Sequence, residues 1–209
     1  LWNCLHKDDL EAYRDSIETS RRELSLWEIE HRILLPSGQL KWIKARGVPT
    51  LYPDGSCVWD TLQIDITDRK LADNELKEKS DFLDKVIDSA ALSTWISDEN
   101  GTAIRANPAC LELFGATEDE VIGKYNIFQD DVVEENGFMP EIRKVFREGI
   151  PANIVIDYDL SDVGHVDVKN AEHKTINSIF TPIKNAQGKI TNVIVQTIDL
   201  SDIKRMENE

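Results

Sequence analysis

The chain contains one short pattern twice. QIDITDRK occupies residues 63–70, and TIDLSDIKR occupies residues 197–205. Each copy follows a Gly-containing turn and an apolar run, and each is followed by residues that favour a helix. A strand-to-helix junction that recurs after more than 130 residues indicates a domain-scale repeat of helix, strands and junction.

Three strand-like segments precede the first junction, at residues 26–35, 40–52 and 57–66. PSG and YPDG turns separate them, which predicts an antiparallel meander. In the third segment, Val58, Leu62 and Ile64 alternate with more polar residues, so we expect a half-buried strand. Upstream, Leu10 and Tyr13 belong to one face of a predicted helix.

The same order precedes the second junction. A helix is predicted over residues 137–149, with Pro140 in its first turn and Gly149 at its end, and strands are predicted at residues 152–160, 174–183 and 190–200. This half also has an earlier hairpin, residues 94–97 and 102–106, and a short helix capped by Asn107. The acidic pair Asp130–Asp131 is interpreted as part of a solvated turn.

Residues 67–90 connect the two halves and show a heptad pattern with Lys79 as its one charged member. The alternative is a surface helix packed on its own domain. The heptad pattern favours a parallel homodimer whose helices meet along a seam of apolar residues: Ala72, Leu76, Leu83, Val86 and Ala90.

ISDENGTAIRANPACLELFGATEDEVIGK, residues 96–124, resembles the N-terminal half of a PAS domain. Residues 34–70 and 181–205 resemble the C-terminal PAC segment of that family, and DITDRK is a typical ending of it. The resemblance implies an α+β fold, with a PAS-like five-stranded antiparallel sheet in the order 2-1-5-4-3 and flanking helices, in tandem.

The resemblance also implies domain boundaries. Residues 1–67 correspond to the C-terminal part of a PAS/PAC-like domain, whose two N-terminal strands are missing. Residues 68–90 form a helical, coiled-coil-like linker, residues 91–201 a complete PAS/PAC-like domain, and residues 202–209 the start of an output helix. The output domain is expected beyond Glu209 in a longer parent protein.

Two functions remain open at this point. The resemblance implies a sensory or signal-relay module, as in sensor histidine kinases, which binds a small molecule or relays a signal through its helices. The alternative is a ligand-free dimerisation or protein-interaction module. In either case the strand-to-helix joints are candidate relay sites, with Asp65 and Asp199 accepting hydrogen bonds and the Thr67 and Ser201 hydroxyls capping the helices.

A ligand pocket is expected between the sheet and the short helices of the second half, although any small core needs similar apolar residues. The candidate lining residues are Trp95, Ile104, Asn107, Phe128, Met139, Ile142, Phe146, Ile156, Tyr158, Asn177, Phe180 and Gln196.

Several functions are disfavoured by what the sequence contains. Haem-binding relatives carry a His on the long helix, and the helix predicted here has none. Flavin-binding relatives carry a reactive Cys in the segment that corresponds to residues 125–131, which contains no Cys. Haem and flavin are therefore disfavoured, and the cofactor stays unknown. His165, Asp167 and His173 share a polar loop, where solvated side chains are commoner than metal ligands, and no metal site is predicted. No catalytic motif of a hydrolase, NTPase or kinase occurs, so the fragment is predicted to be non-catalytic.

Net charge, hydropathy and cysteine spacing limit the partners and the location that we expect for the chain. The formal net charge is −15, which disfavours nucleic acid. No apolar run reaches the roughly 18 residues of a membrane span. The three cysteines are far apart, which favours a reducing, cytoplasmic setting over a disulfide framework.

Overall fold

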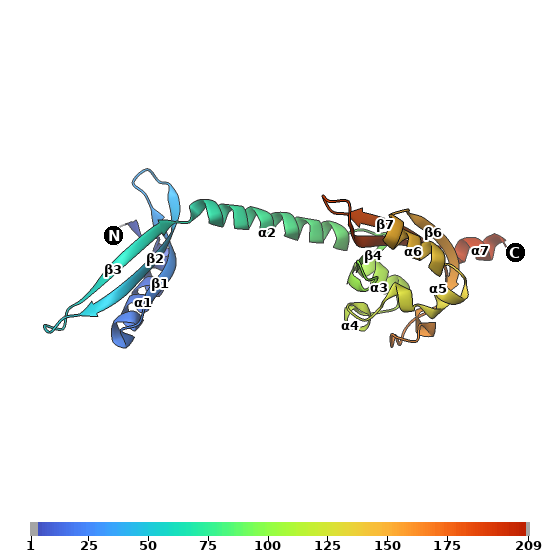
Figure 1. Ribbon diagram of the computed structural model, residues 1–209, viewed down its shortest axis with the longest axis horizontal. Helices are drawn as coiled ribbons and strands as arrows, with labels where there is room; N and C mark the ends of the chain where they lie inside the picture. Colours follow the sequence, from blue (N-terminus) through green and yellow to red (C-terminus); the bar gives the residue numbers. More distant parts are fainter. Residues whose placement is uncertain (1–3, 208–209) are drawn as a thin grey trace. The chain divides into compact units, whose positions relative to one another are not determined.

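The computed structural model describes residues 4–207 (Figure 1). The chain divides into two units, Leu1–Asp81 and Phe82–Glu209. The predicted boundaries at residues 1–3 and 208–209 lie outside the described residues. Among the described residues, no helix combines the length and the apolar character that crossing a bilayer requires.

A three-stranded antiparallel meander forms the sheet of the first unit. Its strands β1 (Trp27–Leu34), β2 (Leu40–Leu51) and β3 (Cys57–Asp65) lie in that order. The 3-10 turn η2 (Lys7–Asp9) leads into helix α1 (Leu10–Glu23), which covers one face of the sheet. The Trp27 indole donates to Ser16 Oγ (2.9 Å), and Trp59 donates to Ser20 Oγ (3.1 Å), so both tryptophans are fixed on the helix.

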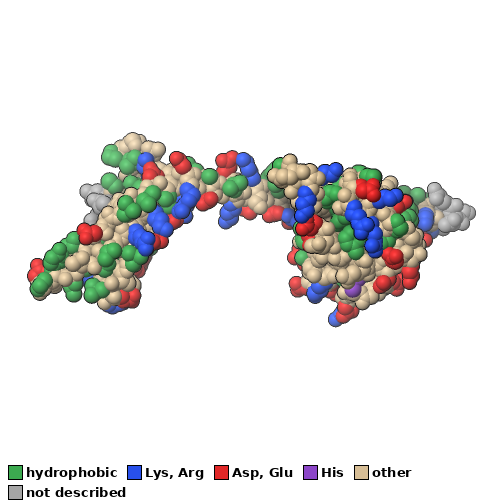
Figure 2. Space-filling model, viewed as in Figure 1, with side chains coloured by type: hydrophobic (Ala, Val, Ile, Leu, Met, Phe, Trp, Pro, Cys, Tyr) green, Lys and Arg blue, Asp and Glu red, His purple; other side chains and the backbone are tan. Residues whose placement is uncertain are grey.

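The other face of β3 differs from the expectation. Val58, Leu62 and Ile64 were expected to be half-buried, yet they are 50%, 62% and 50% exposed. The reason is that α1 packs on the opposite face, where Trp59 lies, and no other described element of this unit covers the face with the three aliphatic side chains. Hydrophobic side chains are accordingly visible over the sheet in Figure 2.

The edge of β3 leads to a prediction about local stability. Within the described residues, β3 pairs with β2 alone. Its counterpart in the second unit is β8 (Ile190–Asp199), which has a paired strand on each side. We expect β3 amides to exchange hydrogen at least about tenfold faster than those of that counterpart, because an edge strand opens locally at lower cost. Hydrogen exchange by mass spectrometry measures this, with the central strand β2 as internal control. Equal protection of both strands would mean that the edge of β3 is covered in solution.

The sheet of the second unit has five antiparallel strands in the order β5-β4-β8-β7-β6. They are β4 (Ser93–Asp98), β5 (Ala103–Ala106), β6 (Ala152–Tyr158), β7 (Lys174–Lys184) and β8 (Ile190–Asp199). Numbered within the unit, this order is 2-1-5-4-3, so the predicted topology is confirmed. The inward-facing residues Ile154, Ile156 and Tyr158 of β6 are buried, as the two-residue alternation predicts.

Short helices complete the second unit. They are α3 (Pro108–Phe114), α4 (Glu118–Val121), η3 (Ile127–Gln129), α5 (Asp131–Glu135), α6 (Met139–Glu148) and η4 (Leu160–Asp162). Their buried side chains form one core with the inner face of the sheet, as Met139, Ile142 and Val145 of α6 illustrate. The loop that follows η4 belongs to this core, because Val163 and Val168 are buried.

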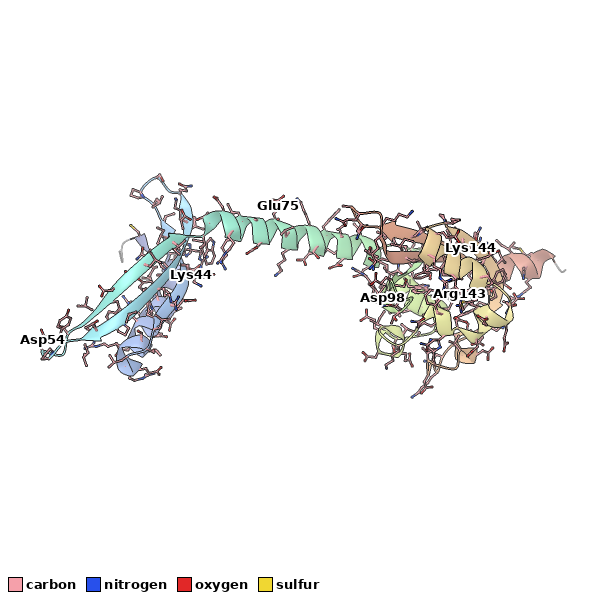
Figure 3. All side chains as sticks on the ribbon, viewed as in Figure 1. Lys44, Asp54, Glu75, Asp98, Arg143 and Lys144 are labelled. Carbon is pink, nitrogen blue, oxygen red and sulfur yellow. The ribbon has the colours of Figure 1, made fainter. Side chains whose placement is uncertain are left out.

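Helix α2 (Thr67–Asp88) begins in the first unit and ends in the second. The expected linker, residues 68–90, is therefore two residues too long at its end, and Ala90 lies outside the helix that was to carry it as a seam residue. None of the α2 residues is buried, and Leu76 and Leu83 are 67% and 59% exposed. Side chains project above and below α2 in Figure 3, Glu75 among them. The last helix, α7 (Ser201–Glu207), follows the second junction.

Candidate functional site

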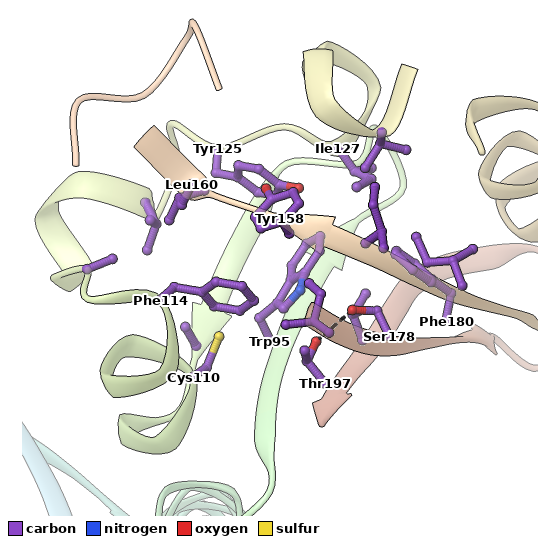
Figure 4. Close-up of a pocket in the computed structure, with 18 of the residues that line it drawn as sticks. Trp95, Cys110, Phe114, Tyr125, Ile127, Tyr158, Leu160, Ser178, Phe180 and Thr197 are labelled. Atoms are coloured by element: carbon purple, nitrogen blue, oxygen red, sulfur yellow. Dashed lines mark hydrogen bonds between the residues drawn. The ribbon is translucent and has the colours of Figure 1, made fainter. Parts of the chain in front are cut away.

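A cavity of about 60 Å³ lies between the inner face of the second sheet and the helices that cover it (Figure 4). For scale, an apolar cavity of roughly 150 Å³ accommodates benzene. The side chains around it are mostly apolar or aromatic: Trp95, Ala106, Cys110, Leu111, Phe114, Ala116, Val121, Tyr125, Ile127, Val133, Ile154, Ile156, Tyr158, Leu160, Ile176, Ser178, Phe180, Val195 and Thr197.

Four of the twelve predicted lining residues surround this cavity: Trp95, Ile156, Tyr158 and Phe180. Met139 and Ile142 are buried in the core but do not line it. Phe128 and Phe146 pack against each other, with ring centroids 4.8 Å apart. Ile104 is not a lining residue, because it is 48% exposed on β5.

The polar candidates Asn177 and Gln196 lie outside the lining. The residues next to them, Ser178 and Thr197, face the cavity, because successive side chains of a strand point to opposite faces of the sheet. The sequence could have indicated this, since Ser178 shares its parity with the buried Phe180.

A buried carboxylate joins the two tyrosines at the cavity. The Tyr125 and Tyr158 hydroxyls both donate to Asp130 Oδ2, at 2.6 and 2.7 Å, and the Val133 amide donates to Oδ1 at 2.9 Å. Burial raises the pKa of both tyrosines well above the usual value, and the nearby charge of Asp130 acts in the same direction. Asp130 is 1% exposed, so its interpretation as part of a solvated turn was wrong.

The loop that carries the metal candidates is used for packing. The His165 ring stacks on Tyr125, with centroids 5.6 Å apart, and its Nε2 accepts the Asn126 amide at 2.8 Å. Within residues 4–207 there is no group of three or more potential metal-ligating side chains. This loop therefore closes the core beside the cavity.

Asn107, another predicted lining residue, is a structural connection that lies outside the cavity lining. Its side chain is fully buried, and its Oδ1 accepts the amides of Thr94 and Cys110, both at 2.9 Å. The two protons of its Nδ2 are shared among three carbonyl groups at and beyond the end of α2: Ile87 (3.2 Å), Ala90 (3.1 Å) and Leu92 (2.9 Å). One amide group thus joins α2, β4 and α3.

Arg105 of β5 reinforces the same connection. Its guanidinium donates to Asp84, and also to Asp88 Oδ1 at 2.9 Å, in the last two turns of α2. The hydrogen bond to Asp88 has the largest effect on the pKa of Arg105 and raises it, and the hydrogen bond to Asp84 acts in the same direction. The end of α2 is therefore held by a charged and a neutral side chain of the second unit.

The first strand-to-helix junction is built from four residues. Asp65 Oδ1 accepts the amide (3.0 Å) and the hydroxyl (2.6 Å) of Thr67, and its Oδ2 pairs with Lys41 at 2.6 Å. Thr67 Oγ1 accepts the Trp42 amide of β2 at 2.9 Å. The expected hydroxyl cap on the helix was therefore wrong: the carboxylate caps α2, and the hydroxyl ties its first residue to the sheet.

The second junction repeats this arrangement. Asp199 Oδ1 accepts the Ser201 amide at 2.8 Å, Lys174 approaches Oδ2 at 3.4 Å, and Ser201 Oγ accepts the Thr175 amide of β7 at 3.0 Å. Burial opposes ionisation of Asp199, but the hydrogen bonds from Ser201 and the charge of Lys174 outweigh it and lower the pKa. In both units the residue that starts the helix is bonded to the neighbouring strand.

The first junction predicts a pH dependence. Hydrogen bonds hold the pKa of Asp65 far below its usual value; the one from Lys41 has the largest effect, and those from Thr67 come next. A depressed pKa contributes stability that is complete above the unfolded value of about 4 and is lost as the pH falls towards the folded value. We expect Asp65→Asn to lower the stability of the first unit at pH 6, and the difference from wild type to shrink below about pH 4. Urea unfolding of both proteins at pH 6 and below pH 4 measures this. A stability difference between wild type and Asp65→Asn that grows on acidification would contradict it.

Comparison with known families identifies the fold. A PAS domain model matches residues 91–202, more than half of the chain, and a PAS fold model matches residues 1–61. The chain therefore belongs to the PAS domain family, and the predicted resemblance is confirmed. Both matches agree with the α+β sheets and flanking helices described above.

Two curated proteins are similar in sequence. The uncharacterized protein y4lL of Sinorhizobium fredii is 27% identical over 122 residues, which cover 58% of this chain and 15% of that protein. The virulence sensor protein BvgS of Bordetella pertussis is 25% identical over 142 residues, 68% of this chain and 11% of that protein. The chain thus spans a small part of each relative.

Solved PAS domains are also similar. The PAS domain of Bordetella pertussis BvgS has a TM-score of 0.41 and 19% identity, covering 63% of this chain and 95% of that one. The PAS domain of an HTR-like protein from Haloarcula marismortui has a TM-score of 0.46 and 16% identity, covering 62% and 98%.

Proposed function

We propose that the chain is a sensory and signal-relay segment of a larger signal-transduction protein, of the sensor histidine kinase class. In this proposal the second unit binds a small molecule in its cavity, and the occupancy alters the junction with α7. The segment itself has no catalytic role. The observation that carries the proposal is that one strand, β8, both lines the cavity and holds the junction.

The path from cavity to helix is short. Val195 and Thr197 line the cavity, and Asp199, two residues further along β8, accepts the amide of the first residue of α7. Two residues of strand span roughly 7 Å. Ser178 lines the cavity from β7, the strand whose Thr175 is bonded to the same helix start. A displacement of either strand end therefore changes the support of α7.

The input side of the proposal rests on α2. Asn107 and Arg105 fix the end of this helix to β4, β5 and α3. A movement of α2 would thus reach the second unit through bonded groups. The sensory role is supported by the sequence similarity to the virulence sensor protein BvgS. The kinase class is carried by the resemblance of the sequence to the PAS/PAC segments of sensor histidine kinases. The output domain would lie beyond Glu209 of the parent.

The measurement that tests ligand binding compares the native mass of the purified chain with its denatured mass. We expect a retained mass in the native spectrum that disappears on denaturation. The matched variant Thr197→Val changes one hydroxyl at the cavity and nothing at the chain surface, and should reduce the retained fraction. A bare native mass, unchanged on incubation with cell extract, would count against a small-molecule sensor.

A second function, ligand-free dimerisation, is favoured by α2. Its apolar side chains Leu76, Leu83 and Val86 recur at heptad spacing and are 67%, 59% and 48% exposed. A second copy of α2, roughly 33 Å long, would cover them in a parallel coiled coil. Both functions can coexist, since the seam and the cavity use different residues.

Leu83→Asp tests this dimer. We expect the dissociation constant to rise at least about a hundredfold, because two carboxylates would have to be buried in the seam. Asn74→Asp adds the same charge at a heptad position away from the seam and should leave the dimer intact. Light scattering after size-exclusion chromatography measures both. A Leu83→Asp chain that remains dimeric at micromolar concentration would move the interface elsewhere.

A further inference from the structure

We propose that the cavity of the second unit takes a small, neutral molecule with a carbonyl-type hydrogen-bond acceptor on an apolar body. This inference rests on the proposed function, because it specifies the ligand of the same site. It follows from an excess of hydrogen-bond donors at one end of the cavity and from the apolar character of the rest.

The donor excess starts with two buried hydroxyls on adjacent strands. Ser178 Oγ and Thr197 Oγ1 are 2.9 Å apart and face each other across the β7–β8 pair. One hydroxyl donates to the other, so one proton of the pair stays unused, and neither oxygen has another hydrogen-bond partner among residues 4–207. Both side chains are at least 95% buried, at 5% and 2% exposure. A buried donor without an acceptor is unfavourable.

A further donor lies on the neighbouring strand β4. Trp95 lines the cavity, and its indole N–H makes no hydrogen bond to the described residues. Figure 4 shows the Trp95 ring beside the Ser178–Thr197 pair. Two donor protons thus belong to side chains that line the cavity from neighbouring strands.

The opposite end of the cavity offers no unused hydrogen-bond donor among the tyrosine hydroxyls. The Tyr125 and Tyr158 hydroxyls both donate to Asp130, whose other oxygen is occupied by the Val133 amide. The walls between the two ends are formed by side chains such as Phe114 and Leu160. A ligand therefore meets donors at one end and hydrocarbon or aromatic surface elsewhere.

The lining also excludes charge. None of the residues that line the cavity is Asp, Glu, Lys or Arg. An ionised ligand would be buried without a counter-ion, which proteins avoid. The volume of about 60 Å³ corresponds to roughly two water molecules of the liquid, so the ligand has few non-hydrogen atoms. The smallest aldehydes, such as acetaldehyde with its single methyl group, meet all of these conditions.

The test compares two molecules of the same shape, acetaldehyde and propene, in which a carbonyl oxygen is replaced by a CH₂ group. The indole N–H signal of Trp95, assigned with Trp95→Phe, is followed in ¹H–¹⁵N correlation spectra of the full chain during titration. We expect acetaldehyde to shift this signal and to bind about five- to tenfold tighter than the alkene, as one neutral hydrogen bond gives. Ser178→Ala combined with Thr197→Val should reduce that preference to less than twofold.

Equal affinity for both molecules would overturn the inference and leave the proposed small-molecule sensor standing. Absence of any shift with either molecule would also overturn it, because ordered water would then suffice for the donors. The native-mass comparison judges the proposed function independently of both results. Dispersed spectra of the double variant will verify that it is folded, and Ser178→Ala alone provides a milder second variant.

Discussion

Replacement of Asn107 by alanine is expected to destabilise the second unit by roughly 3–5 kcal/mol. The side chain has five hydrogen-bonding partners and is fully buried. Alanine would leave the Thr94 and Cys110 amides without partners in the core, and buried donors left unpaired carry most of the cost. The same change frees the end of α2 from β4.

Thr117→Ala is the matched control. Thr117 also stands at a helix N-terminus, where it forms a capping box with Glu120, but that box is exposed. Its loss should cost about 1 kcal/mol. Urea unfolding followed through the amide signals of the second unit compares the two. Equal losses would mean that Asn107 acts as a simple cap and does not connect α2 to the sheet.

Gly115→Ala is expected to lower stability by about 3 kcal/mol or more and to displace the loop after η4. Gly115 ends α3 with φ +61, and a Cβ there would overlap the backbone carbonyl group of Asn170. Backbone atoms cannot yield as a flexible side-chain tip does, so the loop must move. Because Leu160 lines the cavity just before this loop, the cavity should open as well.

Gly123→Ala separates conformational strain from this clash. Gly123 has a similar φ of +74, but its Cβ would meet nothing within 4 Å. It should cost about 1 kcal/mol, the penalty for a left-handed backbone alone. Unfolding free energies of the two variants, with hydrogen exchange over residues 161–173, give the comparison. If both variants lose the same stability and the loop keeps its protection, Gly115 is not what holds the loop.

The strands of the second unit could be predicted because the alternation of apolar residues and the turns between them are local, whereas their order in the sheet followed from the resemblance to PAS domains. The polar residues that line the cavity were harder to predict. Asn177 and Gln196 were preferred for their long polar side chains, although Ser178 and Thr197 share the parity of the buried strand positions. A shift of one residue moves a side chain to the other face of a sheet. Consistent use of parity would have found the hydroxyl pair.

Other features depend on contacts between distant segments. Local sequence placed Thr67 and Ser201 at helix starts, but their hydroxyl partners lie on β2 and β7, about 25 residues away in sequence. Asp130 was interpreted as solvated because its tyrosine partners are not adjacent to it. Such partners appear only when the chain is folded, so residue type and spacing could not predict them.

The position of Asn107 in the sequence also has a chemical consequence. Asparagine ages when the amide nitrogen of the next residue attacks its side chain, and Pro108 has no N–H with which to do so. Asn136 precedes Gly137 just after α5, where both residues are exposed and this reaction meets little steric hindrance. Stored protein should therefore gain negative charge at the end of α5, while the amide that holds α2 keeps its hydrogen bonds throughout the lifetime of the molecule.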